Sequence, residues 1–150
     1  MYNNFQDNIE VRTVDVSFWE EKWKQRQIGF HRNLVNPYLV DYWDLLSIDK
    51  GEKIFLPLCG KSLDIIWLAN QGCNVIGVEC SQLAVDEFMH ENKLTCQQGQ
   101  YNNFNVYMSD NIHLLQGDYF FLTSELMKDV SAVFDRASLV ALPREMRKQY

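Results

Sequence analysis

The segment Ile54–Gly72 reads IFLPLCGKSLDIIWLANQG and contains the triplet Gly60-Lys61-Ser62. Gly-Lys-Ser also ends the phosphate-binding loop of many ATP- and GTP-binding proteins, where backbone N–H groups surround the phosphates. That loop needs a glycine five residues before the Gly-Lys pair, and here the position holds Phe55. Pro57 removes a further backbone N–H from the segment. The triplet therefore does not predict a nucleoside triphosphate site.

Gly60 and Glu79 together indicate a different chemistry. Gly60 follows the apolar run Ile54–Leu56, and Glu79 ends the next apolar run, Val75–Val78, 19 positions later. In doubly wound sheets a glycine after the first strand lets the backbone approach a nucleoside, and an acidic residue after the second strand binds the ribose. This spacing fits a dinucleotide or S-adenosyl-L-methionine. A turn glycine and a solvated carboxylate would also explain the two residues.

The number of glycines separates the two cofactors. A dinucleotide site needs the pattern G-x-G-x-x-G to seat the pyrophosphate, and LCGKSLD has one glycine. S-adenosylmethionine has no pyrophosphate. Its ribose carries a sulfonium and an amino-acid tail where a dinucleotide carries the pyrophosphate. The sequence therefore favours S-adenosylmethionine.

Strand and helix patterns alternate along the second part of the chain, which predicts an α/β fold with a mainly parallel sheet and right-handed crossovers. Short apolar runs predict strands, a hairpin turn is expected at 109–111, and Ser62, Ser81 and Pro143 begin helices. The residues expected to face inward from the helix after Ser81 are Leu83, Ala84 and Phe88. The predicted strands are Ile54–Leu56, Val75–Val78, Phe104–Tyr107, Ile112–Leu115 and Ala132–Phe134.

The N-terminal part is predicted to be helical after a flexible arm. Residues 1–16 show no clear period and form the expected arm. Ser17 and Glu20 form a capping box, which predicts a helix from Ser17 to about Gln27, ended by Gly29. Pro37 is expected to begin a second helix. The apolar face predicted for that helix consists of Tyr38, Leu39, Tyr42, Trp43 and Leu46.

Composition and charge narrow the function classes. The chain has 150 residues, 47% of them hydrophobic, which fits one domain with a core. The net charge of −6, without a run of Lys or Arg, disfavours nucleic acid and anionic membranes as partners. The longest apolar run, Ile65–Ala69, is too short to cross a bilayer. The N-terminus lacks the pattern of a secretion signal, so a cytoplasmic location is expected.

The four cysteines, at positions 59, 73, 80 and 96, form no C-x-x-C pair. They also lack metal-finger spacing relative to His31, His90 and His113. We therefore expect reduced, mostly buried thiols and no metal site.

Three segments resemble the thiopurine S-methyltransferase family, in particular its bacterial branch. They are FWEEKWKQRQIGFH, FLPLCGKSLDIIWLANQGCNVIGVECS and VFDRASLVALPREMRKQY, and the likeness runs from about Phe18 to Tyr150. The resemblance implies a class I, Rossmann-like fold with helices on both faces of the sheet and S-adenosylmethionine as cofactor. It also implies methyl transfer to an aromatic or heterocyclic thiol, and bacterial members are associated with selenium and tellurium compounds.

The resemblance also implies the roles of particular residues. Helices within 17–47 would form a lid over the cofactor-binding part, 51–150, and no residue is expected to act as a catalytic acid or base. The residues implied on the substrate side are Trp19, Phe30, His31 and Arg136. The residues implied to bind the cofactor are Trp23, Leu58, Gly60, Glu79, Asp118, Tyr119 and Arg136.

The chain departs from the family by stopping at Tyr150, before the family's C-terminal strands. The remaining parallel strands are expected in the order 3-2-1-4, which leaves the strand at Ala132–Phe134 on an exposed edge. An unpaired apolar edge can pair with a second chain, so self-association is expected there. Two other functions remain open: methyl transfer to a halide or another small anion, and a non-catalytic module that binds cofactor or self-associates.

Overall fold

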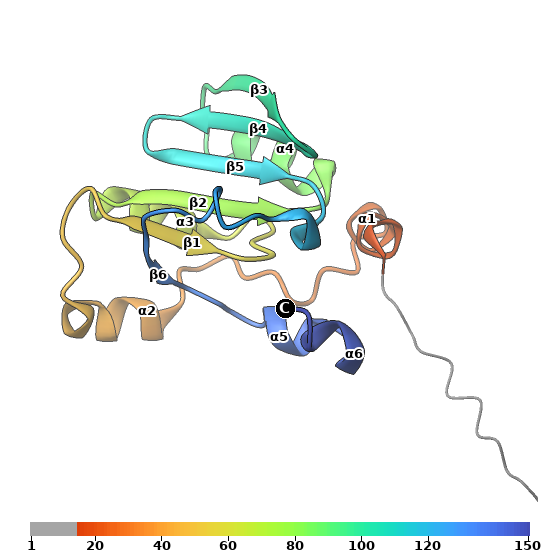
Figure 1. Cartoon of the computed structure of the whole chain (residues 1–150), viewed down its shortest axis with the longest axis horizontal. Helices are drawn as coiled ribbons and strands as arrows, with labels where there is room; N and C mark the ends of the chain where they lie inside the picture. Colours follow the sequence, from red (N-terminus) through yellow and green to blue (C-terminus); the bar gives the residue numbers. More distant parts are fainter. Residues whose placement is uncertain (1–14) are drawn as a thin grey trace, which may run out of the picture.

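The computed structural model describes residues 15–150, which form a six-stranded sheet with helices packed against it (Figure 1). The strand order is β3-β4-β5-β2-β1-β6. The strands are β1 (Lys53–Leu56), β2 (Asn74–Glu79), β3 (Gln97–Tyr101), β4 (Phe104–Ser109), β5 (Ile112–Gln116) and β6 (Val130–Val133). The helices are α1 (Val16–Lys24), α2 (Pro37–Tyr42), η1 (Trp43–Leu46), α3 (Leu63–Asn70), α4 (Gln82–Glu91), η2 (Tyr119–Phe121), α5 (Ser138–Ala141) and α6 (Arg144–Arg147).

The predicted order of the parallel strands is confirmed. β1 pairs in parallel with β2 and β6, and β2 pairs in parallel with β5. The order β5-β2-β1-β6 is therefore the expected 3-2-1-4. The hairpin prediction is also confirmed, because β4 and β5 are antiparallel and Ser109 lies opposite Ile112. The carboxyl ends of β1 and β2 consequently lie side by side, as the site prediction requires.

One strand was not predicted from the sequence. β3 has the sequence QQGQY, all five residues are exposed, and it pairs antiparallel with β4 at the edge of the sheet. Because a strand with no buried side chain has no apolar alternation, the sequence carried no signal for it.

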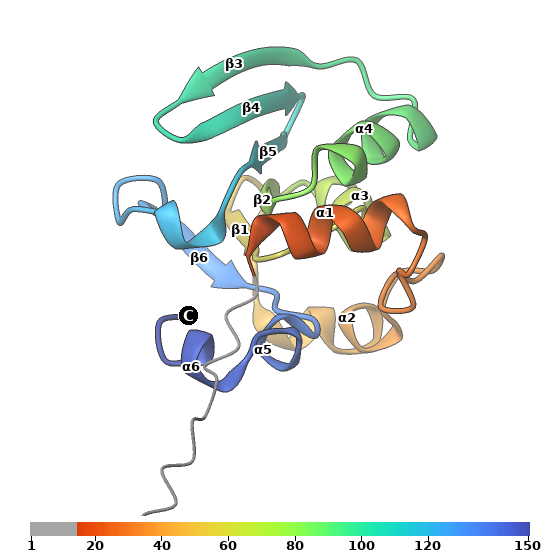
Figure 2. The ribbon, with the colours of Figure 1, turned by 90° about the vertical axis from the view of Figure 1, so that its right-hand side faces the viewer.

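The two faces of the sheet are covered differently. Leu39, Ile65 and Phe88, from α2, α3 and α4, belong to the larger core cluster on one face. The smaller cluster on the other face includes Phe55 and is covered by side chains from η2 and the chain that follows it. Figure 2 shows α1, α3 and α4 on the same side of the sheet. The face opposite α3 and α4 is thus covered by a short 3-10 helix and a loop.

The predicted start of the first helix is wrong by two residues. The N-cap is Asp15, whose carboxylate accepts a hydrogen bond from the Phe18 N–H at 3.0 Å. The Ser17 hydroxyl donates to the same carboxylate at 2.6 Å, and Glu20 accepts the Gln82 N–H on α4 at 3.0 Å. A carboxylate that satisfies the helix N-terminus displaces the expected serine cap. Residues 15 and 16, predicted as part of the arm, belong to the start of this helix, and the rest of the predicted arm, residues 1–14, lies outside the described residues. The helix ends at Lys24 rather than near Gln27.

The second helix begins as predicted, with Asn36 as N-cap and Pro37 at its first position. The prediction of its apolar face is largely wrong, because Leu39 is the buried residue of α2 while Tyr38 is 71% exposed. Trp43 packs edge-on against Trp67 of α3, with ring centroids 5.4 Å apart. Helical periodicity predicted which side is apolar, but not how much of it the sheet covers.

The C-terminal segment begins with β6, which lies at the edge of the sheet. β6 ends at Val133, one residue before the predicted end, and Val133 is 60% exposed. Pro143 is the N-cap of α6, next to its predicted start. Between residues 15 and 150, no helix has the length and apolar character needed to cross a membrane.

Candidate functional site

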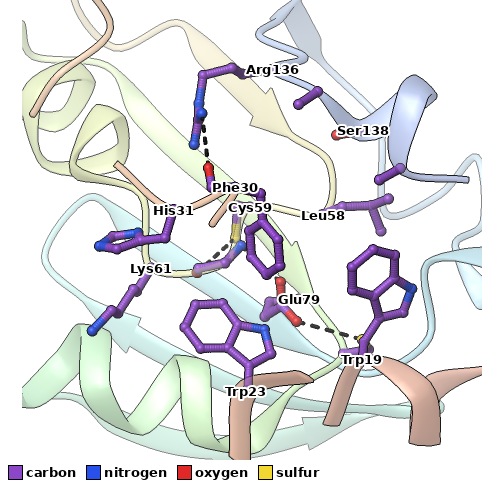
Figure 3. A pocket seen from close by; sticks show the side chains of 14 residues that line it. Trp19, Trp23, Phe30, His31, Leu58, Cys59, Lys61, Glu79, Arg136 and Ser138 are labelled. Carbon is purple, nitrogen blue, oxygen red and sulfur yellow. Dashed lines mark hydrogen bonds between the residues drawn. The ribbon is translucent and has the colours of Figure 1, made fainter. Parts of the chain in front are cut away.

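A cavity lies at the carboxyl ends of β1 and β2, where α1 covers them (Figure 3). Its volume is about 80 Å³. Aromatic side chains from α1 lie on one side and the loop after β1 lies on the other. The lining residues are Trp19, Trp23, Phe30, His31, Leu58, Cys59, Gly60, Lys61, Glu79, Cys80, Arg136, Ala137, Ser138 and Ala141.

Glu79 ends β2 and lies at the bottom of the cavity, where it is 6% exposed. One carboxylate oxygen accepts the Gly60 N–H at 2.8 Å, and the other accepts the Ser81 N–H at 2.7 Å. Burial raises the pKa of Glu79, although the hydrogen bonds from Ser81 and Gly60 act in the opposite direction. The carboxylate therefore joins the tips of the first two strands.

The loop after β1 has a strained backbone where it meets the cavity. Leu58 has φ +45° and Gly60 has φ +54°, both in the left-handed region. A Cβ at Gly60 would lie 3.2 Å from the indole of Trp23. Gly60 is thus required both for the turn and for the close approach of the side chain above it.

Two tryptophans of α1 and the chain after α1 form an aromatic cover. Trp23 is 1% exposed, and its ring centroid lies 5.7 Å from that of Phe30. Trp19, one turn earlier, lies 5.8 Å from Phe30 in an edge-on arrangement. His31 is half-buried, and burial followed by the charge of Lys61 lowers its pKa. Figure 3 shows the two indoles entering the cavity from the same helix.

Charged residues border the cavity mouth. Lys61 is 8% exposed, and its ammonium group donates to Glu87 at 2.8 Å and Glu91 at 2.6 Å. Burial opposes the charged form, but these two carboxylates raise the pKa of Lys61. Arg136, after β6, donates to the Phe30 carbonyl oxygen at 3.2 Å (Figure 3).

Two predicted cofactor residues lie outside the cavity lining. Asp118 caps η2 by accepting the Phe120 N–H at 3.0 Å. Tyr119 stacks on Tyr150, with ring centroids 4.8 Å apart, and on Phe55 at 6.5 Å. Both follow β5, the strand beside β2, so they lie one strand further along the same edge of the sheet. The cavity does not extend to them.

The structure adds lining residues that the sequence had not singled out. Cys59 and Cys80 flank Gly60 and Glu79, and burial followed by the charge of Glu79 raises the pKa of both thiols. Both therefore stay protonated. All four cysteines are free, and Cys96 is the partly exposed one. Among the described residues, no cluster of His, Cys, Asp or Glu could hold a metal ion.

Comparison with known proteins identifies the family. A model described as Thiopurine S-methyltransferase (TPMT) matches residues 14–150. The chain belongs to the thiopurine S-methyltransferase family. A thiopurine S-methyltransferase from Shewanella sp. (strain W3-18-1) is 47% identical over 137 residues, which cover 91% of this chain and 63% of the relative. One from Pseudomonas fluorescens is 45% identical, with 62% of its length covered. The chain therefore spans about 63% of the length of such relatives.

Solved structures show the same fold at low sequence identity. A SAM-dependent methyltransferase from Anabaena variabilis superposes with a TM-score of 0.63 at 17% identity, covering 93% of this chain and 56% of that one. A TehB-like SAM-dependent methyltransferase from Corynebacterium glutamicum gives 0.51 at 14% identity, covering 89% and 61%. The fold is the Rossmann-like one of class I methyltransferases, and S-adenosylmethionine is the cofactor of the family.

Proposed function

We propose that the cavity beneath α1 binds S-adenosylmethionine and serves methyl transfer to the sulfur of an aromatic or heterocyclic thiol, thiopurines included. The observation that carries this proposal is the position of Glu79 at the tip of β2, where it is bonded to the N–H of Gly60, the residue over which the Trp23 indole lies. An acidic side chain at that point suits the ribose hydroxyls, and a glycine suits close contact with the nucleoside. Leu58 supplies an apolar wall.

The chemistry needs positioning more than proton transfer. When bound, the cofactor supplies an electrophilic methyl group on a positively charged sulfur. An aromatic or heterocyclic thiol ionises easily, so a strong general base is not required. Trp19, Trp23 and Phe30 keep water away from a reaction in which opposite charges neutralise each other. Arg136 at the mouth orients an anionic substrate, with His31 beside it. Selenium and tellurium compounds are soft nucleophiles that fit the same chemistry.

The size of the cavity requires a movement of its cover. About 80 Å³ is well below the roughly 300–1,000 Å³ of typical ligand pockets. Trp23 takes up space directly above Gly60. We propose that α1 and the chain up to α2 act as a lid that moves outward to admit the cofactor. Such a movement also extends the space along the sheet edge toward Asp118 and Tyr119, which we propose for the adenine side.

Calorimetric titration with S-adenosylhomocysteine, followed by labelled methyl transfer to a panel of thiols and halides, tests the proposal. We expect binding of S-adenosylhomocysteine and labelling of aromatic thiols. Labelling of halides alone would assign the chain to small anions. Binding without labelling would leave a cofactor-binding module, and absence of binding would refute the site.

Cofactor affinity should depend on pH through Glu79. Ribose hydroxyls donate to the carboxylate form, and burial raises the pKa of Glu79 above its ordinary 4.5. Affinity for S-adenosylhomocysteine should therefore fall as the pH drops through this raised pKa, earlier than an ordinary glutamate would allow. Because the pKa of Glu79 is raised in the folded protein, its protonation favours the folded state at low pH, and this stabilisation is lost as the pH rises. Protonation of Glu79 therefore does not unfold the protein, and the fall in affinity at low pH cannot be explained by unfolding caused by this residue. Calorimetry across a pH series measures it, and the Glu79→Gln variant should show no such dependence.

The free edge of β6 favours self-association of this chain. Among residues 15–150, β6 pairs with β1 and with no other strand, and Val133 is 60% exposed on that edge strand. We propose that two chains pair through their β6 edges, since unpaired backbone groups of a strand bind another strand. Sedimentation should show concentration-dependent dimers, and Val133→Lys should shift them to monomers. Dimers that persist unchanged in this variant would place the contact elsewhere.

A further inference from the structure

The charged residues of the Gly60-Lys61-Ser62-Leu63-Asp64 segment have no role in the proposed cofactor chemistry. They lie beside the chain that joins α1 to α2, residues 25–36, which we call the strap. The strap carries Phe30 and His31 to the cavity. The hydrogen bonds and ion pairs of Lys61 and Asp64 show which residues around the strap these two side chains hold in place.

Asp64 is a buried carboxylate in the first turn of α3, only 2% exposed. One of its oxygens accepts the backbone N–H of Asn36, the last residue of the strap, at 2.7 Å. The other accepts the Ser62 hydroxyl at 2.8 Å and lies 3.7 Å from the Arg136 Nε. A single side chain thus contacts the end of the strap and the arginine at the cavity mouth.

Arg136 connects these contacts to the middle of the strap. Its guanidinium donates to the Phe30 carbonyl oxygen at 3.2 Å while its Nε faces Asp64. The guanidinium has five N–H donors, so these two contacts leave others for a ligand. Because an arginine side chain has many rotamers, contacts on one edge of the guanidinium decide where the remaining donors point.

The start of the strap is held by a different set of charges. Arg26 forms an ion pair with Glu87 of α4, and Glu87 also binds Lys61 at 2.8 Å. These residues do not contact Asp64. Loss of the Asp64 charge should therefore leave the start of the strap in place and affect its end and Arg136.

We propose that Asp64 is a positioning residue that fixes the Arg136 guanidinium and the end of the strap at the cavity mouth. The inference deepens the proposed function, since it rests on Arg136 as the group that meets an anionic substrate. The charged residues of the Gly-Lys-Ser-Leu-Asp segment are then explained by their contacts within the protein, without a bound phosphate.

The test compares the Arg136 Nε–H signal of the whole chain, without ligand, in the wild type and in Asp64→Asn. The asparagine keeps an oxygen for the Asn36 N–H but loses the charge that faces Arg136. We expect the Nε–H order parameter to fall and its exchange with water to rise about two- to fivefold, as the loss of an ion pair at 3.7 Å implies. The amides of β1 and β2 should keep their protection.

Two further variants complete the ligand-free experiment. Asp64→Glu keeps the charge and should retain most of the Arg136 order. Asp86→Asn should change nothing, because Asp86 is an exposed aspartate of α4 whose side chain, within residues 15–150, accepts a hydrogen bond from the Gln82 side chain alone. An unchanged Arg136 signal in Asp64→Asn overturns the proposal. So does a loss of protection across the whole sheet in both Asp64 variants, because that would mark a general structural role.

A double-mutant cycle links Asp64 to the ligand. The dissociation constant of 6-mercaptopurine, with S-adenosylhomocysteine present, is measured for Asp64→Asn, Arg136→Met and the double variant. If Asp64 acts through Arg136, its substitution should change this constant in the wild type and have no further effect beside Arg136→Met. Equal effects in both backgrounds overturn the proposal. If S-adenosylhomocysteine does not bind at all, the proposed function fails while the ligand-free experiment still decides on Asp64.

Discussion

Replacing Glu79 with alanine is expected to raise the dissociation constant of S-adenosylhomocysteine by about 10- to 150-fold. Hydrogen bonds to a charged group contribute about 1.5–3 kcal/mol, which corresponds to that range. Glu79 is the acidic residue at the tip of β2, and it is 6% exposed. Calorimetric titration measures the change directly.

The alanine variant also disturbs the loop, so the binding result needs a second measurement. Glu79 accepts the N–H groups of Gly60 and Ser81, and an unsatisfied buried donor costs about 1–3 kcal/mol. Thermal unfolding of the free protein separates this loss of stability from the loss of affinity. Glu79→Gln keeps one acceptor oxygen and should unfold closer to the wild type while binding as weakly as the alanine variant.

Glu52 provides a matched control. It precedes the amino end of β1, at the far end of the sheet, where it accepts the Asp49 N–H at 2.8 Å. Glu52→Ala should leave the affinity for S-adenosylhomocysteine unchanged. Unchanged affinity in Glu79→Ala would remove Glu79 from the site and, with it, the main support for the cofactor position.

The parallel core could be predicted because its signals are local. β1 and β2 are short apolar runs, and Ser62 and Ser81 each cap the following helix by accepting a backbone N–H. The spacing of Gly60 and Glu79 predicted that both belong to one nucleoside site at the strand tips, and the structure places them together, hydrogen-bonded at 2.8 Å. The rule that ligands bind at the carboxyl ends of parallel strands links this local pattern to a site.

The remaining features depend on contacts between distant segments. Lys61 reaches the cavity rim because Glu87 and Glu91 of α4 hold it there. Ser138 is buried at the cavity because its hydroxyl donates to the Pro57 carbonyl oxygen at 3.0 Å. Neither partner could be inferred from spacing along the chain, since 26 and 81 residues separate Lys61 from Glu87 and Ser138 from Pro57.

Replacing Trp23 with alanine is expected to open α1 and the strap while leaving the sheet folded. Trp23 is the buried residue of the nine in α1 and is 1% exposed. Truncating a buried tryptophan costs about 3–5 kcal/mol. Because α1 lies at the margin of the fold, this cost should appear as local opening, with amide protection in residues 16–36 falling by about two to four orders of magnitude.

Hydrogen exchange read by peptide distinguishes the local effect from a global one. Peptides covering β1, β2 and β5 should keep their protection in Trp23→Ala. Trp19→Ala is the matched control, since Trp19 lies on the same helix one turn earlier and is only partly buried. It should open the lid far less. Equal loss of protection in the sheet and in α1 would make Trp23 a residue of the common core.

The same variant tests whether the lid controls entry of the cofactor. The indole lies over Gly60 and the cavity beneath it holds about 80 Å³, so a nucleoside enters only when α1 has moved. When the binding-competent state is a minor one, its population limits apparent affinity and association. Trp23→Ala should therefore speed association of S-adenosylhomocysteine, because the open state has a lower free energy relative to the closed one. It should speed dissociation even more, because the bound nucleoside also loses its aromatic cover. Stopped-flow measurement of both rates gives the answer, and slower association in the variant would exclude a lid that must open first.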